Sequence, residues 1–495
     1  MLRKIMIAIG LIALLPTISI AGEVNVKKLN TANWIYFETA RFRVLTDAKE
    51  EIAFDLAREL ENFMCFLSFF LGYEQKALPE EVHVVAAKNR GSFKSLGMPD
   101  NLAGLFLERD GYIIFANCER FSSSSKGMGS LGRSFILNEL VHLFLHNASS
   151  ELALPLWYDI GMSRYFSTYM EKKGKVIIGD MSVLRDQFVT MLAGVGGFIS
   201  VDTESLFKMS RKDLDYLDTR RSNEIFVSRF YARATLVVHY MLSDTKRNED
   251  LNHYLSLLKK GSSIDESFKN AFKMTFSELD NKVNHYIEGK NIKIRSYRFG
   301  EDGLNCPDVE YRKHDIAKRG ALGLLYTNIC ILPDDILTDA NFDKLNNDME
   351  KLHPGLIDDT LKNQFAEHPE NPLAMLRLAR TYKRLNKYAE AIDMYERAFF
   401  LKEPDATTLN HYAWFLVTMP DKEFRNPKRA IELAEKAVAM ERSPSYLDTL
   451  AEAYYVNGSI QKAIETINEA ISLNPRNIAY YKDQLKKFKE AEEKL

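Results

Sequence analysis

The sequence predicts an α+β N-terminal domain followed by an all-α array of helical hairpins. Apolar residues in the first 150 positions alternate in some stretches and recur every three to four residues in others, a mixture typical of strands and helices. After residue 371 the pattern repeats about every 34 residues, which indicates stacked hairpins. A chain of 495 residues is also too long for one core and predicts two to four domains.

Composition indicates an ordinary globular protein and excludes some partners. The chain is 46% hydrophobic and 27% charged, with a net charge of −2 from 66 basic and 68 acidic residues. The basic residues are scattered and no nucleic-acid-binding motif is present. We therefore expect no nucleic-acid partner.

The N-terminus has the pattern of a secretory signal peptide over residues 1–21. "MLRK" precedes the apolar run "IMIAIGLIALLP", and the small residues Ser19 and Ala21 predict cleavage after Ala21. Gly22 follows, rather than the cysteine of a lipoprotein. An uncleaved membrane anchor is the alternative. No later stretch reaches about 18 apolar residues, so we expect no stable membrane insertion after cleavage and a periplasmic or extracellular location.

Four cysteines, Cys65, Cys118, Cys306 and Cys330, leave the disulfide state open. They allow three pairings, and none has the spacing of a redox or zinc-ribbon motif. Cys65 lies in the apolar run "NFMCFLSFF", where a buried free thiol is the favoured prediction.

The N-terminal domain is expected over residues 22–290, with its strands in the first part. Residues 33–47 alternate as in a half-buried strand, and a helix is predicted over 49–71. The next predicted elements are a strand at 82–87, a hairpin over 102–117 with Asp110-Gly111 at its turn, and a loop over 121–130. A helix at 135–146 follows, and the chain is then mostly helical to residue 290.

The stretch 291–370 predicts a linker or a helical bridging subdomain. "FGEDGLNCPD" has linker composition, and helical patterns follow over 316–327 and 340–352. No function is predicted for this stretch.

The helix "FILNELVHLFLH" at 135–146 differs by one residue from the zinc-peptidase pattern H-E-x-x-H. In that pattern two histidines one turn apart bind zinc and the glutamate polarises the zinc-bound water. Asn138 stands at the first histidine position, followed by Glu139 and, at the second histidine position, His142.

Further stretches strengthen the resemblance. "LPLWYDIGMSRYF" at 154–166 resembles the gluzincin pattern L-P-x-W-x-x-E-G-x-A-x-Y-F, with Ile160 where the third zinc ligand is expected. Residues 33–47, "FYARATLVVHYML" and "LLKKGSSIDESFKNAF" resemble parts of bacterial peptidase-MA-like domains. The resemblance implies a gluzincin-like, thermolysin-like fold over about residues 33–290, and it makes Tyr231 similar to a transition-state-stabilising tyrosine.

The ligand positions predict a domain without catalytic zinc. Asn138 offers a neutral amide and Ile160 offers no donor, whereas a catalytic zinc needs three protein ligands. We therefore predict no cofactor and a pseudoenzyme. Asp159 adjoins Ile160 but points about 100° away around the helix, so its use as a ligand requires a change of helix register.

The alternative is an active zinc metallopeptidase with a shifted metal site on His142 and His146, which are also one turn apart. Asn138, Glu139 or Asp159 would complete that site. Under the structural alternatives Glu139 bonds to backbone or to Arg164, His146 sits at the negative end of the helix dipole, and Tyr231 is a packed aromatic residue.

Residues 371–478 resemble tetratricopeptide (TPR) repeats. Two units align at the expected period, pairing Leu378 with Leu450, Ala379 with Ala451, Tyr382 with Tyr454, Ala391 with Ala463 and Ala398 with Ala470. The unit between them keeps Ala430 and Ala437 and has a longer turn. Residues 479–495 are expected to form a polar capping helix.

TPR arrays bind partners on a concave surface lined by the first helix of each unit. Arg380, Lys383 and Arg384 on the first such helix predict a site for an acidic peptide or a terminal carboxylate. Asp448 and Glu452 on the third show that the surface is not uniformly basic. The alternatives are a solvated charged face or a purely structural platform. The sequence thus predicts an exported scaffold that binds protein or peptide through its TPR groove.

Overall fold

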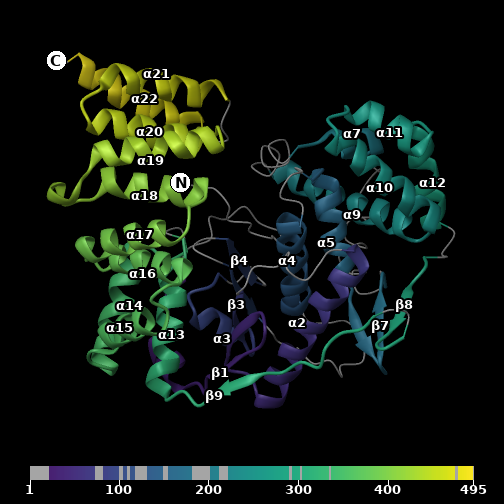
Figure 1. Cartoon of the computed structure of the whole chain (residues 1–495), viewed down its shortest axis with the longest axis horizontal. Helices are drawn as coiled ribbons and strands as arrows, with labels where there is room; N and C mark the ends of the chain where they lie inside the picture. The colour runs from purple at the N-terminus through teal and green to yellow at the C-terminus, as the bar shows by residue number, and fades with distance from the viewer. Residues whose placement is uncertain are drawn as a thin grey trace. The chain divides into compact units, whose positions relative to one another are not determined.

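A computed structural model describes most of the chain. The described residues are 22–72, 82–99, 104–108, 112–117, 131–148, 154–180, 201–210, 221–288, 292–301, 304–333, 336–473 and 478–493. The chain divides into two compact units, one formed by most of residues 22–322 and the other by residues 323–495 (Figure 1). The predicted signal peptide lies outside the described residues. Within the described ranges, no helix combines the length and apolar character needed to span a membrane.

A six-stranded mixed sheet forms the centre of the first unit. Its order is β4-β5-β3-β2-β1-β9. The strands are β1 (Ile35–Glu38), β2 (Phe42–Thr46), β3 (Val82–Ala87), β4 (Gly104–Glu108), β5 (Tyr112–Asn117) and β9 (Arg312–His314). β2 and β3 are parallel, whereas β1 is antiparallel to both β2 and β9. The predicted strand at 82–87 is confirmed, and β4 and β5 lie where the hairpin was expected. Its predicted turn, Asp110-Gly111, lies outside the described residues.

The single strand predicted over residues 33–47 is wrong. This stretch forms two strands, β1 and β2, paired with Ile35 opposite Thr46 and Glu38 opposite Arg43. The Thr39 N–H donates to the Phe42 carbonyl, and the Phe42 N–H donates to the Thr39 hydroxyl at 3.0 Å. Burial alternates along β1 and again from Phe42 to Val44 of β2, so periodicity alone does not reveal the turn between them.

The predicted helix at 49–71 is α2 (Glu50–Leu71). It packs against β2 and against the motif helix, and its apolar residues are buried. It ends at Gly72, whose φ of 70° is in the left-handed region that favours glycine after a helix.

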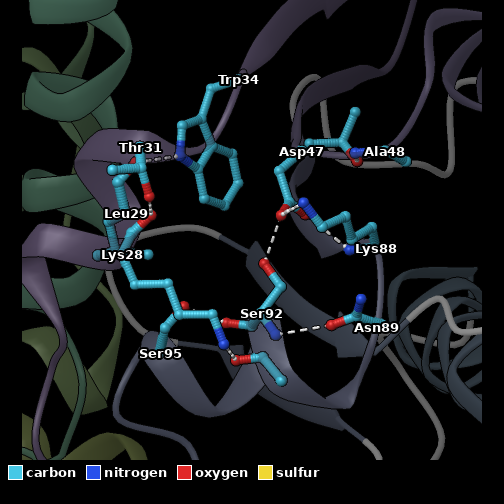
Figure 2. Close-up of polar contacts among 12 residues, drawn as sticks. Lys28, Leu29, Thr31, Trp34, Asp47, Ala48, Lys88, Asn89, Ser92 and Ser95 are labelled. Atoms are coloured by element: carbon cyan, nitrogen blue, oxygen red, sulfur yellow. Dashed lines mark hydrogen bonds and ion pairs between the residues drawn. The ribbon is translucent and has the colours of Figure 1, made fainter.

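Polar contacts fix the ends of β2 and β3 to two short helices (Figure 2). Asp47 follows β2 and accepts hydrogen bonds from the Lys88 N–H at 2.7 Å and the Ser92 hydroxyl at 2.5 Å. Ser92 belongs to α3 (Arg90–Ser95), and Lys28 of α1 (Val26–Thr31) donates to the Gly91 carbonyl at 2.7 Å. These groups satisfy one another, which makes the cluster a structural one.

Helices and a second sheet complete the first unit. The helices are α4 (Leu131–Ala148), α5 (Leu156–Phe166), α7 (Thr203–Lys208), α9 (Arg221–Leu242), α10 (Thr245–Lys259), α11 (Ile264–Phe272) and α12 (Phe276–Glu288). The three-stranded sheet is β6 (Met170–Lys172), β7 (Lys175–Ile178) and β8 (Arg295–Arg298). Sequence analysis missed these short strands. β8 and β9 lie in the stretch expected to be a bridging subdomain, yet they pair with strands of the first unit.

The expectation of a free thiol at Cys65 is wrong, because Cys65 forms a disulfide with Cys306. The bond joins α2 to the segment after β8, 241 positions later in the sequence. A free thiol and a disulfide can both be buried among apolar residues, so the local sequence does not distinguish between these two states of Cys65. Cys330 is a buried free cysteine, and Cys118 lies outside the described residues.

The second unit is helical. Its elements are α13 (Lys318–Cys330), which begins in the first unit, α14 (Asp339–Leu352), α15 (Leu356–Glu367), α16 (Pro372–Arg384), α17 (Tyr388–Leu401), α18 (Ala406–Thr418), the 3-10 helix η3 (Lys422–Phe424), α19 (Pro427–Met440), α20 (Pro444–Val456), α21 (Ile460–Ser472) and α22 (Ile478–Glu492). From α16 to α21 they form three successive antiparallel hairpins, and α22 packs on α21 (Figure 1). The expected helices at 316–327, 340–352 and 479–495 correspond to α13, α14 and α22.

Candidate functional site

The motif helix α4 places Glu139 and His142 on one face, since residues three apart lie on the same side of a helix. Both are buried, with exposed fractions of 0% for Glu139 and 6% for His142. Asn138 is half-buried, and its amide donates to Glu139 Oε1 at 3.1 Å. The amide thus interacts with the neighbouring carboxylate.

Helix α5 brings Asp159 to His142. The distance between His142 Nδ1 and Asp159 Oδ1 is 2.6 Å, and Asp159 is 4% exposed. Asp159 lies at the start of a regular helix, where its N–H bonds to the Pro155 carbonyl. The expectation that Asp159 needs a change of helix register to serve as a metal ligand stays a prediction. The packing of α4 on α5 decides which side of α5 meets His142, and the sequence pattern does not contain that information.

The His142–Asp159 contact defines the chemistry available to the imidazole. A carboxylate at Nδ1 accepts its N–H and leaves Nε2 as the nitrogen that can bind a metal or accept a proton. Asp159 therefore orients His142, as a carboxylate does behind a metal-binding histidine. Ile160, at the expected ligand position, is buried and apolar.

The residues at the positions aligned with the three gluzincin ligands do not fit a zinc centre. They are an amide, an imidazole and an isoleucine, where that pattern has two imidazoles and a carboxylate, and a catalytic zinc needs three protein donors. Among the described side chains, no group of three or more His, Cys, Asp and Glu residues is arranged to hold a metal ion. His146 lies in α4 one turn beyond His142, but its side chain is outside the described part, so the shifted site remains a hypothesis.

Gly161 allows α5 to pack closely on α9. A side chain there would place its Cβ 2.5 Å from the Ala234 carbonyl oxygen and 2.5 Å from Val238 of α9. The glycine adjoining the expected ligand position therefore has a packing role of its own.

Tyr231 on α9 is half-buried, and the Arg164 guanidinium of α5 lies 5.4 Å from the centre of its ring. Burial lowers the pKa of Arg164 to about 10, and the Tyr231 hydroxyl opposes that shift. The contact is a cation–π interaction. It supports the interpretation of Tyr231 as a packed aromatic residue.

A buried ion pair anchors α4 to α2. Arg133 and Glu59 are both buried and are bonded through two guanidinium nitrogens, one of them at 2.6 Å. Arg133 also donates to the Tyr169 carbonyl at 2.6 Å. Because Arg133 precedes Glu139 on the same helix, the pair fixes the position of the motif. The local sequence pattern does not predict this pair, because nothing in it links residues 74 positions apart.

A second buried histidine, His239 of α9, joins three segments. Its Nε2 lies 2.9 Å from the Gly179 carbonyl, so Nε2 carries the proton. Nδ1 then accepts from the Tyr286 hydroxyl of α12 at 3.0 Å, and that hydroxyl accepts from the Lys293 N–H at 3.2 Å. Burial lowers the pKa of His239, which favours this neutral state.

In the repeat unit, small residues pack the helices together as the sequence predicts. These are Ala379, Ala391, Ala398, Ala430, Ala437, Ala451, Ala463 and Ala470, all essentially inaccessible to solvent. Their burial is what permits close approach of the paired helices.

The three predicted peptide-binding residues lie together near the end of α16 but have different surroundings. Arg384 donates to the Leu332 carbonyl at 2.8 Å and to the Leu337 carbonyl at 3.1 Å, which ties α16 to the α13–α14 connection. Lys383 Nζ lies 5.6 Å from the centre of the Phe415 ring, and Arg380 is buried. Arg384 thus has a structural role that the sequence analysis missed.

The acidic residues of α20 are also buried. Glu452 accepts from Lys487 of α22 with both carboxylate oxygens, at 2.8 and 2.6 Å. Asp448, one turn earlier, accepts from the Tyr480 hydroxyl at 3.0 Å. The capping helix therefore contributes directly to this face of the array.

The second unit is of the helical-repeat class, built from stacked hairpins with small residues at their contacts. Residues 373–403 and 444–477 match the tetratricopeptide repeat family. The C-terminal part of the chain therefore contains TPR repeats, and the TPR prediction is confirmed. A comparison with curated proteins gives no match.

Proposed function

We propose that the protein is an exported scaffold that binds a partner polypeptide through its TPR array. The TPR repeats support a protein-binding role, because stacked hairpins of this kind create extended surfaces for polypeptide partners. The observation that carries the proposal is the succession of three hairpins with their alanine contacts intact.

In this proposal the first unit is a gluzincin-like domain that has lost its metal site. The order of mixed sheet, motif helix α4, and packed helices α5 and α9 supports the resemblance. Loss of zinc is supported by Asn138 and Ile160 at ligand positions. The role proposed for the domain is non-catalytic.

Export is supported by the signal-peptide pattern and by the Cys65–Cys306 disulfide, since disulfides persist in oxidising compartments. N-terminal sequencing of the protein isolated from its source tests this. Export predicts a mature chain beginning at Gly22, and a chain retaining Met1 contradicts it.

Site-specific photo-crosslinking in cells tests partner binding by the array. A photoreactive residue at Trp414, half-exposed on the first helix α18, is expected to trap a discrete partner. The matched control is Lys436, exposed on the second helix α19. Equal crosslinking at both positions, or none at Trp414, contradicts the proposal.

The second candidate function, an active zinc peptidase using His142 and His146, is favoured by the buried Glu139 beside an imidazole already oriented by Asp159. Metal analysis separates the two. The scaffold proposal expects well below one zinc per chain after dialysis and the same result for Glu139→Gln. One equivalent of zinc, together with casein hydrolysis abolished by Glu139→Gln, establishes the peptidase instead.

A further inference from the structure

Two buried polar side chains occupy equivalent places on successive first helices of the array. Asn410 of α18 and Asp448 of α20 each precede by three residues a fully buried alanine, Ala413 and Ala451, at the aligned small-residue position. Helices α18 and α20 pack on each other, so the two side chains belong to one face of the array.

Each of the two side chains has an oxygen that accepts no hydrogen bond from the described residues. Asp448 is 4% exposed, and its Oδ2 accepts from the Tyr480 hydroxyl, whereas its Oδ1 has no hydrogen-bond partner among the described residues. Asn410 is 8% exposed, and its Oδ1 likewise lacks a donor within the described part of the chain. Buried acceptors without donors are costly, so natural proteins rarely retain them without a reason.

The neighbouring polar groups in the described part of the chain supply no donor to Asp448 Oδ1. Glu452 on the same helix takes both of its hydrogen bonds from Lys487, and Gln484 donates to the Tyr480 hydroxyl rather than to the carboxylate. Burial raises the pKa of Asp448 to about 6. The carboxylate is thus mostly ionised at neutral pH.

We propose that Asp448 and Asn410 form a subsite for a primary ammonium group of a bound polypeptide, with the ammonium on Asp448 Oδ1 and a neighbouring N–H on Asn410 Oδ1. This inference rests on the proposed partner binding by the array and specifies its chemistry. Only one oxygen of Asp448 lacks a donor among the described residues, which suits an ammonium, whereas a guanidinium prefers both oxygens of a carboxylate. The ammonium belongs to a lysine side chain or to a free N-terminus.

Full-length mature protein and a set of 12-residue peptides of one common sequence test this subsite. The peptides differ at a single central position, which is lysine, arginine, acetyl-lysine or glutamate, and each is made with a free and an acetylated N-terminus. The variant Asp448→Asn keeps an acceptor for Tyr480 and removes the charge. The matched control is Glu435→Gln, because Glu435 also accepts from a tyrosine hydroxyl, that of Tyr454, but lies exposed on α19.

The expected result is that lysine or the free N-terminus binds about tenfold to a hundredfold more tightly than its acetylated form, as expected for a charge-assisted hydrogen bond. Asp448→Asn abolishes that preference, and Glu435→Gln retains it. Asp448→Asn also raises the melting temperature of the free protein, since a buried charge is removed. If acetylation of the lysine weakens binding, the bound ammonium is that of a lysine side chain. If acetylation of the N-terminus weakens binding, the bound ammonium is that of a free N-terminus.

Other outcomes overturn the inference. Preferential binding of the glutamate peptide keeps the array as a polypeptide-binding surface but rejects the ammonium subsite. A lysine preference unchanged in Asp448→Asn rejects the assigned residue. A lower melting temperature for Asp448→Asn with no change in any affinity gives Asp448 a structural role only. Absence of binding to every peptide, with no crosslink at Trp414, rejects the proposed function as well.

Discussion

Removal of the Cys65–Cys306 disulfide is expected to destabilise the first unit strongly. The bond closes a loop with a sequence separation of 241 residues. A cross-link stabilises the folded protein by reducing the conformational entropy of the unfolded chain. For a loop of this length the chain-entropy relation gives a stabilisation of at most about 5.5 kcal/mol at 25 °C. This is a large fraction of the 5–15 kcal/mol that stabilises a typical domain.

Urea unfolding of the oxidised protein, the reduced protein and the Cys65→Ala/Cys306→Ala variant measures this contribution. Fluorescence of Trp34 and Trp157, both buried in the first unit, follows the transition. We expect a lower midpoint in the reduced protein and in the variant, and no effect of reductant on the variant. Equal midpoints for oxidised and reduced protein, or alkylation of Cys65 and Cys306 in denatured protein that was never reduced, would refute the reasoning.

Three further predictions concern the buried polar groups. Burial lowers the pKa of His239, so below about pH 6.5 this histidine takes up a proton in the unfolded chain before it does so in the folded protein, and the free energy of unfolding falls with falling pH by at most about 1.4 kcal/mol per pH unit. Unfolding measured between pH 5 and 8 should depend less on pH in His239→Gln, and an unchanged pH dependence refutes the neutral state of His239. Arg384→Met removes the donors to the Leu332 and Leu337 carbonyls and should lower the free energy of unfolding of the array by about 2–5 kcal/mol, measured by thermal unfolding. Unchanged stability together with weaker peptide binding would instead support the prediction that Arg384 binds peptide. Arg133→Met should lower the free energy of unfolding by about 3–5 kcal/mol, because the Glu59 carboxylate stays buried without its partner. Adding Glu59→Gln should restore part of that stability. A double variant no more stable than Arg133→Met argues against a stabilising ion pair.

The repeats were predictable because their determinants are local and periodic. Alanines at fixed positions and a period near 34 residues specify the hairpins without knowledge of any other part of the chain. The helix α2 and strand β3 followed from periodicity for the same reason. The short strands β6, β7 and β8 did not, since three or four residues are too few to establish a period.

The candidate sites depended on contacts that sequence patterns do not encode. The sequence identified Glu139, His142 and Asp159, but only the packing of α4 on α5 joins His142 to Asp159. In the sequence, Arg384 looked like part of a basic cluster. Its structural role was not predictable, because its partners are backbone carbonyls, which every residue has. Asn410 could have been found by aligning the middle unit with the third and allowing for its longer turn, which places Asn410 opposite Asp448.

The bonds from Arg384 to the α13–α14 connection have a consequence for how the array meets other molecules. They join α16 to the preceding helices, while α22 covers α21 at the opposite end. Within the described residues, each terminal hairpin of the array is therefore packed against a further helix. A bound peptide is then expected to lie across the hairpins of the array.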